Sequence, residues 1–543
     1  MSWQVKNAVN QGWLSGSMPM QLSLRLLSIV WLFVLTSCTS LPPLENRAVS
    51  SALNPEQAAT TRFAQMLAPL QQAHPDKSGI YPLADALDAF AARMLLAQHA
   101  ERTLDIQYYI WHKDMTGTLL FEALHEAADR GVRVRLLLDD NNTSGLDETL
   151  SVLDSHPNIQ VRLFNPFMRR NYRAVEYLTD FNKANRRMHN KSFTVDNQLT
   201  IIGGRNVGDE YFGAGDGVLF ADLDILAAGP VVQEVSHDFD RYWQSESAYP
   251  VSLILPEVSP ARLQELEDQA EEVERNPAAA KFVQSLHQLP ILNQLTEQAL
   301  ALEWAKVTLV SDDPRKGLGD VADDDLLFGK LIHLVGSPEK SLNLVSPYFV
   351  PTKVGAKAFA NLSQAGVEIQ ILTNSLHATD VYVVHSGYSK WRKKLVKNGV
   401  KLYEMRQMGE RSTKPKLLNR TGDKEGLSTV FGSSGSSLHA KTFTLDDDIV
   451  FVGSFNFDPR SAKLNTELGF VIEDSQLSQK IKAAFAEEVP YNAYEVQLCN
   501  NSQLCWIEKS QTGLLIHHTE PESTLLKRAG VQFLSWLPID WLL

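Results

Sequence analysis

Two copies of one short motif hold the residues best suited to chemistry. The first copy, MHNKSFTVDNQLTIIGGRN, contains His189 and Lys191, and the second, LHAKTFTLDDDIVFVGSFN, contains His439 and Lys441. The two copies lie 250 residues apart. Residues two positions apart on a strand share a face, so each copy presents one imidazole and one ammonium group together. The duplication predicts one site that uses two histidines and two lysines.

Each copy has the pattern of two strands joined by a tight turn. Polar and apolar residues alternate up to Asp196 or Asp446, and a second apolar run follows. Asp favours tight turns because its side chain accepts hydrogen bonds from nearby backbone, so we expect both aspartates to form turns rather than to react. The copies end on Asn206 and Asn456.

This set of side chains suits transfer at a phosphodiester. Such a reaction needs a nucleophile, a proton for the departing alcohol, and donors around the phosphoryl oxygens. Two histidines supply the first two roles, and two lysines with two asparagines supply the third. Zinc is disfavoured, because an ammonium group beside each imidazole repels a cation. We therefore expect no metal and no cofactor.

Composition indicates a folded protein of more than one domain. The 543 residues are 44% apolar and 21% charged, and one hydrophobic core rarely serves a chain of this length. The net charge of −13 argues against a nucleic-acid partner, because such affinity comes mainly from Lys and Arg. We divide the chain into a leader (1–38), an irregular tether (39–80), two lobes (81–300 and 301–490) and a C-terminal hairpin with an interfacial tail (491–543).

The same order of elements is predicted in both lobes. In the first lobe we expect helices at 83–101, 116–130 and 146–155 and strands at 103–110, 132–140 and 159–165. In the second lobe we expect helices at 326–335, 355–365 and 384–397 and strands at 342–350, 367–374 and 400–405, and segments beginning at Asp222 and Glu467 are expected to close the two sheets. Alternating strands and helices predict an α/β fold with a mixed, largely parallel sheet covered by helices on both faces. Two such lobes related by a pseudo-twofold axis would share one active site.

The leader has the pattern of an export signal. Arg25 precedes the apolar run Leu26 to Leu35, which is short for a membrane span, and Leu-Thr-Ser-Cys follows. This resembles a bacterial lipoprotein signal, which implies that Cys38 is lipid-modified; the alternative is a plain membrane anchor with an incidental cysteine. Cys499 and Cys505 would form a hairpin disulfide in an oxidising compartment and two thiols in the cytosol. We expect a lipid-anchored protein on the periplasmic face of a Gram-negative envelope.

Taken together, the motifs resemble those of the phospholipase D superfamily. His-x-Lys-x4-Asp, then Gly-Gly-x-Asn or Gly-Ser-x-Asn, then an acidic residue occur in order in both halves, and the resemblance runs from about Ile80 to Pro490. Stretches such as DIQYYIW, RRMHNKSFTVD, GSFNFDPRS and the terminal LPIDWLL are similar to the cardiolipin synthases of Gram-negative bacteria. That resemblance implies a phosphatidyltransferase with phospholipid substrates.

The superfamily resemblance also assigns roles to the residues. It implies that His189 forms a phosphohistidine and that His439 protonates the departing alcohol and then deprotonates the incoming one; exchanging the two roles would leave the rest unchanged. The phosphoryl oxygens would be held by Lys191, Lys441, Asn206 and Asn456. Asp222 and Glu467 would each accept the far ring N–H of a histidine. Ser454 is a candidate for binding a phosphate oxygen, although its counterpart is Gly204.

Three regions are candidates for contact with a lipid surface. The tract before His189 mixes the aromatic residues Phe164, Phe167, Tyr172 and Tyr177 with the arginines Arg169, Arg170, Arg173, Arg186 and Arg187, of which Arg186 and Arg187 are the nearest candidates for binding substrate. The alternative for this tract is a partly solvated loop and helix with ordinary packing. A basic helical face at 389–401 has the same ambiguity, and Trp536 and Trp541 lie in an apolar tail.

Four functions fit these residues to different degrees. The first is synthesis of cardiolipin from phosphatidylglycerol with phosphatidylethanolamine or a second phosphatidylglycerol. The second is phospholipase D activity, in which water replaces the acceptor alcohol. A periplasmic nuclease is disfavoured by the acidity and the anchor, and a catalytically dead binding module is disfavoured because both motifs are intact. The resemblance leaves room for a small accessory protein as a partner.

Overall fold

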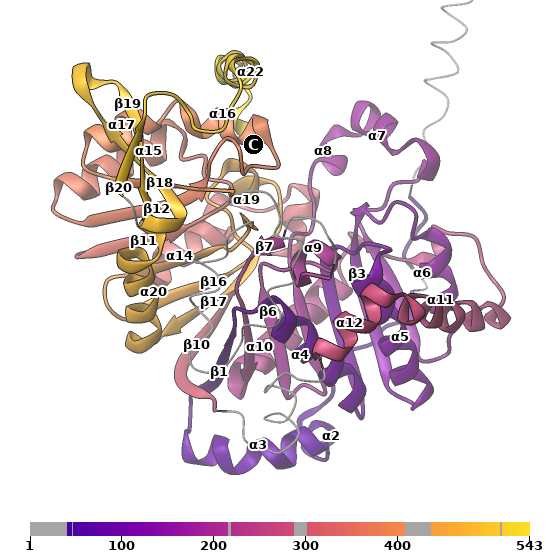
Figure 1. Cartoon of the computed structure of the whole chain (residues 1–543). Helices are drawn as coiled ribbons and strands as arrows, with labels where there is room; N and C mark the ends of the chain where they lie inside the picture. Colours follow the sequence, from indigo (N-terminus) through magenta and orange to yellow (C-terminus); the bar gives the residue numbers. More distant parts are fainter. Residues whose placement is uncertain (1–40, 46, 215–218, 287–300, 408–435, 511–512) are drawn as a thin grey trace, which may run out of the picture.

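The computed structural model of the chain describes residues 41–45, 47–214, 219–286, 301–407, 436–510 and 513–543. Leader residue Cys38 lies outside these residues. Figure 1 shows the two lobes side by side, with the sheet running through both. No helix in the described ranges is long and apolar enough to cross a membrane.

In the described part of the chain, a mixed sheet of 18 strands forms the centre of both lobes. The first lobe contributes β1 (Ser78–Leu83), β2 (Thr103–Ile110), β3 (Arg133–Asn142), β4 (Ile159–Phe164), β5 (Ser192–Val195), β6 (Leu199–Gly203), β8 (Asp224–Ala228) and β9 (Ala248–Pro250). The second contributes β10 (Glu303–Ser311), β11 (Ser341–Val345), β12 (Glu368–Asn374), β13 (Lys401–Met405), β15 (Thr442–Leu445), β16 (Ile449–Gly453), β17 (Leu468–Glu473), β18 (Ala493–Leu498), β19 (Leu504–Ser510) and β20 (Gly513–His517). The parallel part is limited to β2–β3–β4 and β11–β12–β13, and the other pairs in this sheet are antiparallel.

The two lobes join edge to edge, which the sequence did not indicate. We expected β8 and β17 to close the two sheets. Instead, β8 pairs with β1, β17 pairs with β10, and β1 pairs with β10. A buried cluster beneath this junction combines Ile80 and Ile225 with Val307 and Phe470. The lobes therefore share a hydrophobic core as well as a sheet.

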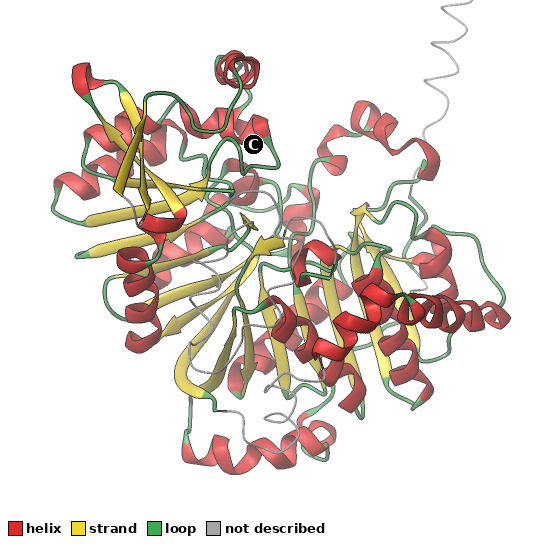
Figure 2. Ribbon diagram, in the orientation of Figure 1, coloured by secondary structure: helices red, strands yellow, loops and turns green. Residues whose placement is uncertain are grey.

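Helices cover both faces of the sheet (Figure 2). The first lobe has α2 (Pro55–Ala58), α3 (Arg62–Ala73), α4 (Ala86–His99), α5 (Met115–Asp129), α6 (Asp147–Asp154), α7 (Arg173–Thr179), α8 (Phe181–Ala184), α9 (Asp209–Phe212), α10 (Pro230–Trp243), α11 (Gln264–Arg275) and α12 (Pro277–Leu286). The second has α14 (Leu327–Val335), α15 (Thr352–Gln364), α16 (Tyr382–Ser389), α17 (Arg392–Lys397), α19 (Pro459–Lys463), α20 (Ser475–Glu487), α21 (Val489–Asn492) and α22 (Leu525–Ser535). Gly131 and Gly366, which follow α5 and α15, have the left-handed φ values of 92° and 101° that end many helices.

Three expectations about elements are corrected. The segment 39–80 is not irregular throughout, because α3 packs Phe63 and Leu67 into the first-lobe core and β1 joins the sheet. Strand β11 ends at Val345, before Pro347, which has no N–H to donate to a neighbouring strand. The helix expected at 384–397 is two helices, α16 and α17. Beyond their break, Arg392 is buried against Glu404 and Glu520, so this side chain is not part of an exposed basic face.

Candidate active site

Both His-x-Lys segments lie at the boundary between the lobes. The backbone N–H of His189 donates to Thr466 O at 2.9 Å, and that of His439 donates to Ala221 O at 2.8 Å. A two-stranded parallel pair, β7 (Leu219–Ala221) with β14 (Ser436–Leu438), makes the second of these contacts. Each segment therefore adjoins the part of the opposite lobe that carries an acidic residue, Glu467 for His189 and Asp222 for His439.

The histidine and carboxylate pairs cross between the lobes. His189 Nδ1 lies 2.8 Å from Glu467 Oε2, and His439 Nδ1 lies 2.6 Å from Asp222 Oδ2. All four side chains are buried. With Nδ1–H donating to a carboxylate, Nε2 of each ring is the atom left for substrate. The expected role of Asp222 and Glu467 is thus supported by geometry, with each acid serving the histidine of the other lobe.

The two carboxylates are held in different ways. A Cβ on Gly204 would lie 2.2 Å from Asp222 Oδ1, so glycine leaves the space that this carboxylate fills. In the second lobe the equivalent position is Ser454, whose hydroxyl donates to Glu467 Oε2 at 2.5 Å and accepts from Leu468 N at 3.1 Å. The hydroxyl proton of Ser454 is thus engaged by Glu467 and is not available to a phosphate oxygen in this arrangement. The Ser454 hydroxyl orients Glu467 instead.

Electrostatics distinguish the two histidines. Burial, together with the charges of Lys191 and Lys441, lowers the pKa of His189 well below its ordinary value. Burial also raises the pKa of its partner Glu467 to about 7, although Lys191 and the Ser454 hydrogen bond oppose that shift. The neutral form of His189 is favoured, and a neutral imidazole has a free electron pair on Nε2.

The His439 pair has a different balance. Burial alone would raise the pKa of Asp222, but His439, Lys441 and Arg205 lower it to about 2. Burial and Lys441 lower the pKa of His439, whereas the ionised Asp222 opposes this change. A carboxylate that stays ionised stabilises a protonated imidazole, so His439 is better placed than His189 to carry a proton.

The two lysines lie beside the imidazoles of their own motifs. Lys191 Nζ donates to His189 O at 2.6 Å, and Lys441 Nζ donates to His439 O and lies 3.1 Å from His439 Nδ1. Burial lowers the pKa of both, that of Lys191 to about 7. A buried ammonium group that has few partners gains most when an anionic phosphate arrives.

The two motif asparagines differ in how many of their amide groups already have hydrogen-bond partners. Asn206 accepts from Ile110 N at 3.1 Å and donates to Tyr211 Oη at 3.0 Å, which leaves one amide N–H. Asn456 is buried, and its Oδ1 has no hydrogen-bond partner in the part of the chain that the structure describes. Both therefore keep hydrogen-bonding capacity for a substrate.

Sequence reasoning missed the tyrosines and an aspartate that surround the histidines. Tyr109 contacts the ring of His189 edge-on, with ring centroids 4.9 Å apart, and Tyr211 contacts His439 in the same way at 5.2 Å. Asp139 accepts from Met188 N at 2.7 Å and so holds the backbone just before His189. Tyr109 and Asp139 lie at the carboxyl ends of the parallel strands β2 and β3, a position that was a usable signal.

The arginine and aromatic tract before His189 is largely structural. Arg187 is buried, lies 4.7 Å from the centroid of the Phe167 ring and donates to Asn165 O, and Phe164 and Phe167 are fully buried. Arg186 is half-buried and donates to Lys316 O and Lys463 O. Both guanidinium groups donate to backbone carbonyl groups of the protein, and a substrate-binding role for either arginine stays a prediction. The apolar side chains of this tract that reach solvent are Tyr172, Val175, Leu178 and Phe181.

The aspartates at the hairpin tips are turn formers, as predicted. Asp196 and Asp446 have φ values of 51°. The Asp196 carboxylate accepts from the backbone N–H groups of Glu101, Arg102 and Thr103, and Asp446 accepts from those of Glu339, Lys340 and Ser341. Both therefore fix the start of the neighbouring strand, β2 or β11.

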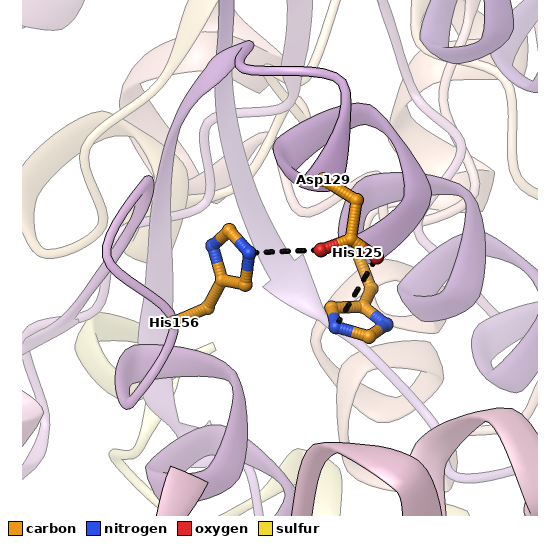
Figure 3. A group of neighbouring side chains, drawn as sticks. All are labelled: His125, Asp129 and His156. Atoms are coloured by element: carbon orange, nitrogen blue, oxygen red, sulfur yellow. Dashed lines mark hydrogen bonds and ion pairs between the residues drawn. The ribbon is translucent and has the colours of Figure 1, made fainter.

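Among the residues that the structure describes, two groups of side chains outside the histidine pairs have the composition of a metal site. His125 and Asp129 on α5 approach His156, and Figure 3 shows both rings turned toward the carboxylate. His156 Nε2 lies 3.1 Å from Asp129 Oδ1, while its Nδ1 accepts from Asn158 N. A histidine that binds metal usually donates through its second nitrogen, so this arrangement favours a hydrogen-bonded structural group. A second group, His112 with Asp114 and Glu210, is partly exposed.

Known proteins resemble this chain over most of its length. Residues 95–243 and 331–489 match the family described as "Cardiolipin synthase, PLD-like domain". Cardiolipin synthase C of Escherichia coli (strain K12) is 48% identical over 482 residues, which is 89% of this chain and 100% of that protein. An uncharacterized protein of Helicobacter pylori (strain ATCC 700392 / 26695) is 31% identical over 88% of this chain and 92% of its own length.

A solved structure supports the same architecture. The crystal structure of a phosphatidylserine synthase from Haemophilus influenzae Rd KW20 aligns with a TM-score of 0.52 at 13% identity, covering 88% of this chain and all of that one. At this level of identity the likeness concerns the fold alone.

Proposed function

The chain belongs to the cardiolipin synthase family with phospholipase D-like domains, and we propose that it transfers phosphatidyl groups between phospholipids through a covalent intermediate on His189. The enzyme class follows from the 48% identity over nearly the whole chain. The single observation that supports the mechanism is the pair of crossed histidine–carboxylate contacts, in which each lobe supplies a buried acid to the buried histidine of the other lobe.

In the proposed first step, His189 Nε2 attacks the phosphorus of a donor phospholipid. The bond from phosphorus to the headgroup oxygen breaks, and His439 gives its Nε2 proton to the departing alcohol. Lys191 and Lys441 neutralise the charge that builds up on the phosphoryl oxygens. The unequal pairs support this assignment, because neutral His189 is the better nucleophile and His439 beside ionised Asp222 is the better acid.

In the second step, the hydroxyl group of an acceptor phospholipid gives its proton to His439 and attacks the same phosphorus. The bond from phosphorus to His189 Nε2 breaks, which restores both histidines. With phosphatidylglycerol as acceptor the product is cardiolipin, and the donor is phosphatidylethanolamine or a second phosphatidylglycerol. Water at this step would give phosphatidic acid, so the hydrolase differs from the transferase by the acceptor alone.

Features around the site support lipid acceptors over water or nucleic acid. The net charge of −13 disfavours a polyanionic substrate. Among the exposed large apolar side chains are Leu178 and Phe181 on α7–α8, and Phe533, Trp536 and Trp541 in the C-terminal segment. Apolar side chains beside the site would hold the enzyme at the lipid surface and raise the local concentration of acceptor hydroxyl groups.

The protein acts on phospholipids and associates with membranes, and we place it on the periplasmic face through a lipid on Cys38. The lipobox pattern supports the anchor. The disulfide between Cys499 and Cys505, with sulfurs 2.00 Å apart, supports an oxidising compartment, because such bonds rarely persist in the cytosol. The proposal allows for a small accessory protein as a partner.

The decisive test replaces each catalytic histidine separately. His189→Ala and His439→Ala should each lower cardiolipin formation at least about 1,000-fold, because neither lobe supplies both roles. The measurement is lipid analysis of a cardiolipin synthase-null host and of mixed vesicles of phosphatidylglycerol and phosphatidylethanolamine. His333→Ala, an exposed histidine on α14, is the matched control.

A second arm looks for the covalent intermediate. A donor with p-nitrophenol as leaving group needs no proton from His439, so His439→Ala should release p-nitrophenol once and keep the phosphoryl label on the His189 peptide through a P–N bond that is acid-labile and base-stable. Label on any other residue would overturn the assignment. If the wild-type enzyme, with any required partner present, produces mainly phosphatidic acid in these vesicles, the protein is a hydrolase.

A further inference from the structure

A loop that follows β12 is fixed beside the segment that leads to His439. Asn374 donates through Nδ2 to Leu438 O at 2.9 Å and accepts from Leu438 N at 3.0 Å. Farther along the loop, Ser437 Oγ donates to Ala378 O at 2.9 Å. These three bonds lock residues 374–378 to the residues immediately before His439. Asp380, two residues after Ala378, is therefore held at the His439 side of the active site.

Asp380 is an exposed carboxylate with a defined orientation. Its Oδ2 accepts from Tyr348 Oη at 2.7 Å. Tyr348 is fixed in turn, because Ser346 Oγ donates to Tyr348 O at 2.8 Å and accepts from Phe457 N, next to Asn456, at 3.1 Å. The hydrogen bond from the Tyr348 hydroxyl therefore fixes the orientation of the Asp380 carboxylate, and Tyr348 itself is held from the side of the site where Asn456 lies.

No cation in the described part of the chain forms an ion pair with Asp380. The other carboxylates near His439 are occupied, Asp222 by His439 itself and Glu210 by His112 at 3.2 Å. The charge of Asp380 nevertheless acts on groups of the site: it opposes the burial that lowers the pKa of Lys441, and it adds to the burial that raises the pKa of Tyr211. An unpaired anion this near a phosphate site repels a phosphodiester, unless another part of the same substrate is cationic.

We propose that Tyr348 and Asp380 form a subsite for the ammonium group of the departing headgroup. The inference rests on the proposed function, in which His439 protonates the leaving alcohol, so that the headgroup departs on the His439 side. In an ethanolamine headgroup, two carbon atoms separate that alcohol oxygen from the ammonium group. The Asp380 carboxylate would accept its N–H groups, and the Tyr348 ring would offer a π face. A glycerol headgroup has no charge for this subsite.

The test compares donors that differ in headgroup charge. Purified full-length chain would act on vesicles with unlabelled phosphatidylglycerol as acceptor, and with either phosphatidylethanolamine or phosphatidylglycerol as labelled donor. Asp380→Asn should lower headgroup release from phosphatidylethanolamine at least about fivefold and leave release from phosphatidylglycerol unchanged or higher. Tyr348→Phe should shift the same ratio less, because it frees the carboxylate without removing its charge. Asp268→Asn, an exposed acid on α11, is the charge-matched control.

The outcomes separate this inference from the proposed function. If Asp380→Asn lowers headgroup release from both donors together, Asp380 has a structural role and the subsite is overturned. An unchanged ratio of release from the two donors would also overturn the subsite. Failure of the wild-type enzyme to make cardiolipin from either donor would overturn the proposed function instead. Headgroup release is measured alongside cardiolipin, so the subsite is tested even if water is the acceptor.

Discussion

Asp222 and Glu467 differ by one methylene group, and each accepts a hydrogen bond from the histidine of the opposite lobe. Their surroundings move their pKa values in opposite directions. Burial raises the pKa of Glu467, whereas His439 and Lys441 overcome burial and lower that of Asp222. At neutral pH, Asp222 is ionised and Glu467 is close to its titration midpoint. This difference at the residue scale is what gives the two histidines different tasks.

The opposite shifts predict opposite effects on stability. The folded-state pKa of Glu467, about 7, lies above its unfolded value of about 4.3, so the stability that its protonated form contributes is present below pH 4.3 and is lost as pH rises through 7. Glu467→Gln should therefore raise the free energy of unfolding by about 1–3 kcal/mol at pH 8 and change it little at pH 5.

Asp222 has the reverse sign. Its folded-state pKa of about 2 lies below the unfolded value of about 3.9, so its ionised form contributes stability above pH 3.9 that is lost as pH falls through 2. Asp222→Asn should lower the free energy of unfolding by about 1–3 kcal/mol at pH 8. Urea unfolding of both variants at pH 5 and pH 8 measures this, and equal losses at pH 8 would contradict it. Both variants should lose activity.

At the element scale, each motif hairpin anchors a strand of its own lobe. The aspartate at its tip accepts three backbone N–H groups at the start of β2 or β11. These parallel strands carry active-site groups near their other ends. Strand β2 pairs with β5 as far as Gln107, which lies opposite Ser192, and Tyr109, two residues farther along β2, contacts the ring of His189. The motif aspartate thus sets the position of the strand, and the strand sets the position of the site.

Removing these acceptors should cost stability in proportion to burial. Asp196 is fully buried, so Asp196→Ala should lower the free energy of unfolding by about 3 kcal/mol or more, and half-buried Asp446 should cost about 1–2 kcal/mol when changed to Ala. Asn at either position keeps one acceptor and tolerates the left-handed φ, so it should recover part of the loss. Guanidinium unfolding measures both series; an equal loss for the two alanine variants would refute the burial argument.

Local patterns predicted most elements, because periodicity and turn chemistry act over a few residues. The bounds of β2 match the expected strand Thr103–Ile110, and both motif hairpins form as expected. Contacts between distant segments were beyond such reasoning. The crossing of the histidine–carboxylate pairs and the β1–β10 junction depend on how the lobes pack, and Arg187 is buried because Asp139 and Phe167, both distant in sequence, surround it.

On the scale of the whole molecule, exposed apolar side chains from both lobes meet at one end. Figure 1 shows α7 and α8 of the first lobe and α22 of the second projecting at the same end, on either side of the C-terminus. Phe181 and Trp541 link the two regions, with ring centroids 6.2 Å apart. We define this surface as the apolar patch, formed by Tyr172, Leu178, Phe181, Phe533, Trp536 and Trp541.

The patch predicts membrane binding that does not require the lipid anchor. The chain from Thr39 onward should sediment with phospholipid vesicles, and Leu178→Ser with Trp536→Ser should weaken that binding at least about tenfold, since each buried large apolar side chain contributes about 1.5–3 kcal/mol. Ile332→Ser on α14 is the control for loss of an exposed apolar residue. In cells, Cys38→Ser should abolish lipid labelling. Unchanged vesicle binding would refute the patch, and unchanged labelling would refute the anchor.

Both half-sites belong to one chain, and the sheet is continuous between them through β1 and β10. In a dimer of identical chains, symmetry would repeat every substitution, so two different histidine–carboxylate pairs could not arise. In this chain, by contrast, a single substitution changes only one of the two half-sites. Glycine faces an aspartate in one half, and serine faces a glutamate in the other. Because both lobes belong to one chain, this asymmetry is encoded in the sequence, and each histidine–carboxylate pair can be changed by mutation without altering the other.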